Sequence, residues 1–232
     1  MRDDADDRQR NRIRRQVRFA AGIEPDEPGA PGGGSLFSES ILVFNEKPKL
    51  VELTAEYTVF DRDGTEVGTA VESGHHVLDK VARLLSPALA SELRRRVEVR
   101  DADGALVLVL EKAAHFLRPE VSVSRPDGTP VGRIALRGRG LRPVFDIHTT
   151  EHRIGSVRDS SLRGDEISVL DLTGTEIAHI TKTWEGVARV TFTRADHYVL
   201  RILRPLTDPL RTMVVATALC VDLALKTDTR TL

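Results

Sequence analysis

Apolar and polar residues alternate along most of the chain after residue 36, in short runs separated by turn residues. The two-residue period is clearest from Val97 to Arg100 and from Val121 to Ser124. Successive side chains of a strand point to opposite faces of a sheet, so the pattern predicts antiparallel strands with one buried and one solvated face. Roughly a dozen such strands are expected, and a single antiparallel sheet of that size has to curl or close.

The predicted strands are paired by one repeated turn. An aspartate or arginine stands three places before a glycine in Asp61 to Gly64, Asp101 to Gly104, Arg125 to Gly128 and Asp171 to Gly174. An aspartate accepts local backbone hydrogen bonds there, and glycine takes the positive φ of a type I turn followed by a bulge. A degenerate copy, residues 145–155, has His152 in place of the glycine. The repeat therefore predicts consecutive β-hairpins.

The last apolar run, Met213 to Leu225, is hydrophobic around its whole circumference. A helix without a polar face needs burial on every side, and a barrel of this size is too wide for its own side chains to fill. We therefore predict a helix over residues 208–226 inside a closed barrel formed by residues 36–232, with Thr207 or Asp208 capping the helix. Its core positions are expected to be Met213, Ala216, Leu219, Cys220 and Leu223.

The same run does not fit a membrane span. A bilayer requires roughly 20 apolar residues, whereas this run is shorter and contains Asp222. A second helix is predicted from Leu78 to Leu93, broken at Pro87, and is expected to cover one end of the barrel.

Residues 1–35 differ in composition from the rest of the chain. Four aspartates precede six arginines, and proline and glycine are frequent from Pro25 to Ser35. Such a composition buries little apolar surface, which favours a disordered charged tail and a flexible linker. Ile13, Val17 and Ala21 recur at helical spacing, so a basic amphipathic helix is the alternative.

Charge and composition exclude several classes of protein. The formal net charge is -1 over 232 residues, so no overall basic field favours nucleic acid. A single cysteine, Cys220, allows no internal disulfide, and the N-terminus has no apolar run typical of a secretory signal. We expect a cytoplasmic protein. The chain has no nucleophile elbow, phosphate-binding loop or histidine spacing typical of a metal site, so we expect no enzymatic activity.

Three segments follow the hairpins in order: Arg194 to Tyr198, Asp208 to Arg211, and Ala218 to Asp222. In this combination the chain, from about Leu36 to Lys226, resembles the tubby C-terminal-like superfamily. The resemblance is closest to bacterial relatives of phospholipid scramblases and of the plant LURP-one-related proteins. It implies a twelve-stranded barrel around a hydrophobic helix. It also implies membership of a group whose members are associated with phosphoinositide binding, with calcium-dependent lipid scrambling, or with no established activity.

The resemblance bears on cofactors as well. Scramblases have an acidic segment before the helix that is linked to calcium, and here only Asp196 and Asp208 are acidic in the corresponding region. Calcium favours six to eight oxygen ligands. We therefore expect no cofactor, with calcium at these two aspartates as the open alternative.

Arginines gather near one predicted hairpin end, at Arg133, Arg137, Arg139 and Arg142. Guanidinium groups bind phosphate in bidentate fashion, so these residues are candidates for a lipid headgroup or another anion, with a solvated loop as the alternative. We expect a non-enzymatic, scramblase-like protein that binds anionic lipid peripherally at the inner face of the plasma membrane. The alternative is a protein-interaction or structural scaffold without lipid activity. The oligomeric state stays open.

Overall fold

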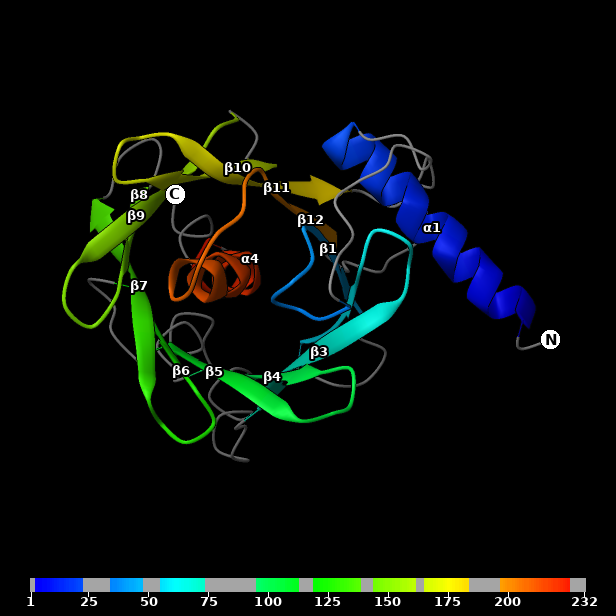
Figure 1. Ribbon diagram of the computed structural model, residues 1–232, viewed down its shortest axis with the longest axis horizontal. Coiled ribbons are helices and arrows are strands. Elements are labelled where there is room, and N and C mark those ends of the chain that lie inside the picture. The colour runs from blue at the N-terminus through cyan, green and yellow to red at the C-terminus, as the bar shows by residue number, and fades with distance from the viewer. Residues whose placement is uncertain are drawn as a thin grey trace, which may run out of the picture.

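Twelve antiparallel strands form a closed barrel around one helix in the computed structural model (Figure 1). The structure describes residues 3–22, 34–47, 55–73, 95–112, 119–138, 144–161, 165–183 and 197–225. Each strand pairs with its neighbours in the chain, and β1 pairs with β12 to close the sheet. The predicted barrel class is confirmed.

The strands are short, and all are antiparallel to their neighbours. Their bounds are β1 Ile41–Glu46, β2 Glu56–Phe60, β3 Glu66–Ser73, β4 Arg95–Asp101, β5 Leu106–Lys112, β6 Glu120–Ser124, β7 Pro130–Gly138, β8 Val144–His148, β9 Arg153–Asp159, β10 Glu166–Asp171, β11 Glu176–Thr183 and β12 His197–Ile202. The helix predicted for residues 78–93 lies outside the described residues.

The repeated turns have the predicted geometry. Gly64, Gly104, Gly128 and Gly174 all have positive φ, between 81° and 88°. In the β10–β11 turn, Asp171 Oδ1 accepts hydrogen bonds from the amides of Thr173 (2.9 Å) and Thr175 (3.0 Å). The strand register shifts beside each of these turns, as a bulge requires. The turn residues therefore fix where each hairpin reverses.

Glycine also allows close approach between strands. A Cβ added at Gly132 on β7 would lie 2.2 Å from the carbonyl oxygen of His148 on β8 and 3.0 Å from the sulfur of Met213. No side chain fits at 2.2 Å, so this position requires glycine for packing rather than for backbone conformation.

The barrel is filled by helix α4, Leu210–Leu225, which lies in the centre of the ring of strands (Figure 1). Met213, Ala216, Leu219 and Cys220 are at most 5% exposed and belong to one core cluster with the inward-facing strand residues. Leu223 lies on the last turns of α4, and its side chain is outside the described part. Burial raises the pKa of the Cys220 thiol, which makes this group an inert core residue.

Residues 3–21 form a helix, α1 (Asp3–Ala21), on the outside of the barrel (Figure 1). This differs from the expectation of a structureless tail and matches the helical alternative. The physical reason is an apolar area on the outer face of the barrel, made of Ile41, Val43, Phe60 and Val199, which we call the outer patch. Ile13 and Val17 of α1 pack against it and are 0% and 4% exposed. Burial of these two side chains stabilises a helix that composition alone disfavours.

Candidate functional site

Two of the four arginines predicted to bind anions are engaged by carboxylates. Arg133 and Arg137 lie on β7. The Nη1 atom of Arg133 donates to Glu120 Oε2 on β6 at 2.9 Å. The Nε atom of Arg137 donates to Asp146 Oδ2 on β8 at 2.8 Å, and its Nη2 atom donates to Oδ1. Cross-strand pairing therefore neutralises both cations where the sequence predicted an anion site.

Asp146 lies on β8 and binds arginines from both neighbouring strands, Arg137 on β7 and Arg153 on β9. Arg153 Nη1 donates to its Oδ1 atom at 3.4 Å. The hydrogen bond from Arg137 lowers the pKa of Asp146, and in return raises the pKa of Arg137, so the pair is ionised at neutral pH. Arg139 and Arg142 lie outside the described residues. A cluster of all four arginines therefore stays a prediction.

Asp208 is one of the two aspartates that the sequence offered for calcium, and its carboxylate accepts hydrogen bonds at the start of α4. Its Oδ1 atom accepts hydrogen bonds from the hydroxyl (2.6 Å) and the amide (3.3 Å) of Thr212, and its Oδ2 atom accepts one from Arg125 Nη2 at 3.0 Å. Burial acts to raise the pKa of Asp208, but the bonds from Thr212 and Arg125 outweigh it and the pKa is lowered. Asp208 therefore anchors the helix start to the β6–β7 turn.

Asp196 lies outside the described residues. Within the part of the chain that the structure describes, no group of three or more histidine, cysteine, aspartate or glutamate side chains is placed to hold a metal ion. Calcium at Asp196 and Asp208 stays an untested alternative.

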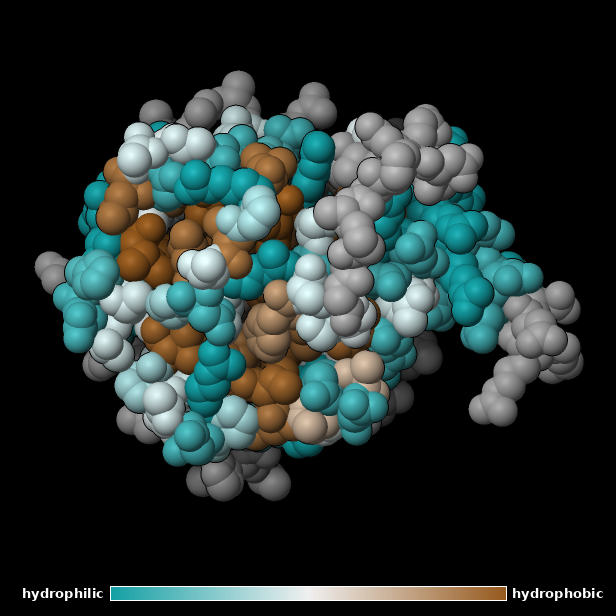
Figure 2. All heavy atoms as spheres, viewed as in Figure 1, coloured by the Kyte–Doolittle hydropathy of each residue, from teal (hydrophilic) through white to brown (hydrophobic). Residues whose placement is uncertain are grey.

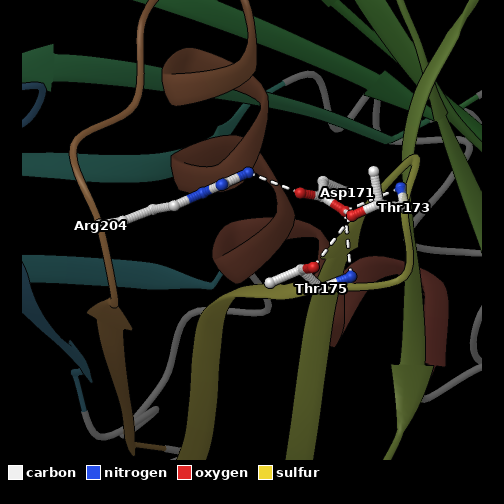
Figure 3. Close-up of polar contacts among 4 residues, drawn as sticks. All are labelled: Asp171, Thr173, Thr175 and Arg204. Atoms are coloured by element: carbon white, nitrogen blue, oxygen red, sulfur yellow. Dashed lines mark hydrogen bonds and ion pairs between the residues drawn. The ribbon is translucent and has the colours of Figure 1, made fainter.

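A cavity of about 520 Å³ opens beside the start of α4, at the end of the barrel where the repeated turns lie. Its walls come from the β8–β9 turn, the β10–β11 turn and residues 207–210. Asp171 lies in this wall, and Arg204 Nη2 donates to its Oδ2 atom at 2.6 Å (Figure 3). The hydroxyl of Thr173 donates to Asp171 Oδ1 at 2.6 Å.

These contacts keep Asp171 ionised. The hydroxyl hydrogen bond from Thr173 lowers its pKa most, burial opposes it, and the amides of Thr175 and Thr173 and the charge of Arg204 lower it further. The two aspartates of the cavity, Asp171 and Asp208, are thus both bound to arginines and threonines. They fix the turns and the helix start in place.

Helix α1 carries a run of exposed positive charge on the described surface. Its six arginines, at positions 8, 10, 12, 14, 15 and 18, all have exposed side chains, and no acidic residue lies between Arg8 and Ala21. Phe19 lies in the same segment and is 78% exposed. Figure 2 shows the hydrophilic surface of this helix projecting from the barrel. We call residues 8–21 the cationic segment.

The cationic segment contacts β1, β11 and β12 of the barrel. In addition to Ile13 and Val17, Gln16 Nε2 donates to Asn45 Oδ1 of β1 at 3.1 Å in a buried position. A Cβ added at Gly64 would lie 2.9 Å from the Cα atom of Arg10, so α1 also passes directly over the β2–β3 turn. The docked helix therefore presents its arginines to solvent in a defined orientation.

The sequence of β1 contains a signal for this contact. Ile41 to Phe44 are four consecutive apolar residues, and all six residues of β1 are buried. A strand that faces solvent on its outer side alternates, whereas one that is covered on both faces reads as a continuous apolar run. The run therefore indicated that another element covers β1.

Comparison with known proteins identifies the family of the chain. The model of the Scramblase family matches residues 49–225. That match covers most of the chain, and the chain belongs to the Scramblase family. The crystal structure of a protein from Arabidopsis thaliana is similar with a TM-score of 0.47 and 11% identity, over 79% of this chain and 91% of the other. No curated protein matches the chain significantly. Among the described helices, none combines the length and apolar character needed to cross a bilayer.

Proposed function

We propose that this member of the Scramblase family is a non-enzymatic protein that binds anionic phospholipid at a membrane surface through the cationic segment of α1. The observation that carries the proposal is the exposure of all six arginine side chains along one docked helix. The family match supports a lipid-related role.

Electrostatics favours the basic end of α1. An arginine near an anionic leaflet contributes up to about 1 kcal/mol. The aspartates at positions 3, 4, 6 and 7 oppose this attraction, but they lie at the other end of the helix. At 1.5 Å per residue, Asp7 and Arg18 are about 16 Å apart along the axis, which is roughly twice the physiological screening length. Arg18 therefore acts on a surface largely independently of Asp7, whereas Arg8 and Arg10 lie within one turn of Asp7 and are partly offset by it.

Flotation of the full chain with vesicles tests the proposal. The vesicles contain phosphatidylcholine alone or phosphatidylcholine with phosphatidylserine, and the salt concentration is varied. We expect the protein to float with the anionic vesicles at low salt and to be released as salt rises. The triple variant Arg10→Gln, Arg14→Gln, Arg15→Gln is expected to lose most of this binding.

The matched control is Arg133→Gln with Arg137→Gln, which removes two exposed charges from β7 and is expected to bind as the unmodified protein does. Loss of vesicle binding in this control, but not in the triple variant, would show that the lipid-binding site lies on β7 and not on α1. Equal absence from anionic and neutral vesicles would contradict lipid binding and favour the alternative of a protein-interaction scaffold.

A further inference from the structure

The face of α1 that could enter a bilayer is turned toward the barrel. Ile13 and Val17 are the buried apolar side chains of the helix, with Ala20 partly buried beside them, and all pack on the outer patch. A helix that lies in a membrane interface buries its apolar face below the headgroups, with its basic side chains beside the phosphates. While α1 is docked, Ile13 and Val17 are covered by the barrel, whereas the arginines and Phe19 are open to lipid.

The contact between α1 and the barrel is incompletely satisfied. Gln16 and Asn45 are 8% and 4% exposed and share one hydrogen bond. The remaining amide atoms, Gln16 Oε1 and Asn45 Nδ2, are buried without a hydrogen-bond partner. A buried polar atom without a partner opposes the docking that buries it. This contact is therefore weaker than its apolar side chains alone would make it.

The barrel has a core that does not include α1. The inward-facing strand residues and α4 form one cluster, and the outer patch with Ile13 and Val17 forms a separate one. Closure of the sheet runs through β1 and β12 directly. Because α1 contributes nothing to the interior, its release leaves the fold complete.

We propose that α1 is exchanged between the barrel and the bilayer: the outer patch holds its apolar face in the absence of membrane, and an anionic lipid surface competes for that same face. This inference rests on the proposed lipid-binding function. The outer patch and the membrane then compete for the same apolar face of α1, which contains Ile13 and Val17. Weakening the patch therefore strengthens lipid binding, because less of the protein is in the docked state that withholds Ile13 and Val17.

The test changes the barrel and leaves α1 intact. Val43 and Val199 face each other across β1 and β12 in the outer patch. The variant Val43→Ser, Val199→Ser removes two buried apolar side chains, which shifts docking by at least about tenfold. The matched control is Val109→Ser on β5, a buried valine outside both apolar clusters. Hydrogen exchange of residues 8–21 measures docking, and vesicle titration measures binding.

We expect the double variant to exchange faster in α1 and to bind phosphatidylserine-containing vesicles about tenfold more tightly. The control is expected to change neither. Ile13→Ser is expected to loosen docking and also to weaken binding, since this side chain serves both surfaces. Faster exchange in the double variant without tighter binding would overturn the inference, and so would unchanged exchange, because docking would then not depend on the patch. If neither the unmodified protein nor the double variant binds the vesicles, the proposed function itself fails.

Discussion

A charge placed in the middle of α4 gives a sharp test of the enclosed helix. Ala218 is 2% exposed and belongs to the core cluster inside the barrel. Replacing it by aspartate puts a carboxyl into this apolar interior. Full burial raises the pKa of a carboxyl from about 4 to roughly 7–9. At pH 7 the buried group is therefore protonated in the folded state, and folding has to take up that proton.

The size of the effect follows from the pKa difference. Aspartate in the unfolded chain has a pKa of about 3.9, roughly three units below pH 7. At about 1.4 kcal/mol per unit, taking up the proton lowers the free energy of unfolding at pH 7 by about 4 kcal/mol. Domains of this size are stable by only about 5–15 kcal/mol, so the loss is a large part of the total. Because the folded-state pKa is the higher one, the cost is largest above that pKa and declines as pH falls toward 4.

The matched control is Ala218→Asn, which introduces a side chain of nearly the same size without the titrating charge. Urea unfolding of both variants between pH 4.5 and 7.5, followed by circular dichroism, gives the difference in free energy of unfolding. We expect the aspartate variant to be less stable than the asparagine variant by about 4 kcal/mol at pH 7 and by progressively less on acidification. Equal stability at all pH values would show that position 218 is not in a dry interior.

Three further results are expected. Gly132→Ala should lower the free energy of unfolding by about 1–3 kcal/mol, because the added Cβ would lie 2.2 Å from the His148 oxygen. At Gly138 an added Cβ would meet nothing within 4 Å, so Gly138→Ala should change the free energy of unfolding by no more than about 0.5 kcal/mol. Urea unfolding of both variants measures the difference. Carboxyl NMR titration should show that Thr173→Val raises the pKa of Asp171 more than Arg204→Gln does; the reverse order would contradict the leading role of the hydroxyl hydrogen bond. Arg137 holds the pKa of Asp146 below its usual value, so this pair contributes stability above about pH 4 that is lost as pH falls. Asp146→Asn should therefore flatten that part of the pH profile of the free energy of unfolding. An unchanged profile would refute the contribution of this pair.

The hairpins and the enclosed helix could be predicted because their signals are local. Glycine at a position of positive φ and an aspartate three places earlier specify a turn, as at Asp171 to Gly174. An apolar helix with no polar face can only be enclosed, which places Met213 and Ala216 inside. Closure followed from the number of strands, since an open sheet of that width is unfavourable.

The docking of α1 could not be predicted from its own residues. Its composition favours a solvated chain, and its stability comes from Ile41, Val43, Phe60 and Val199, which are distant in sequence. The pairing of Arg137 with Asp146 was missed for the same reason, because the partner lies on the neighbouring strand. The register between neighbouring strands decides which arginines face a carboxylate and which stay available for an anion. The positions of the arginines in the sequence do not give this register.

Hydrogen exchange of the full chain with and without phosphatidylserine-containing vesicles tests lipid binding through α1 most directly. The account predicts that exchange changes in residues 8–21, with the barrel strands β4 to β10 unaffected, and that phosphatidylcholine vesicles produce no change. A change confined to β7 and β8, or the same exchange in residues 8–21 with both kinds of vesicle, would contradict it.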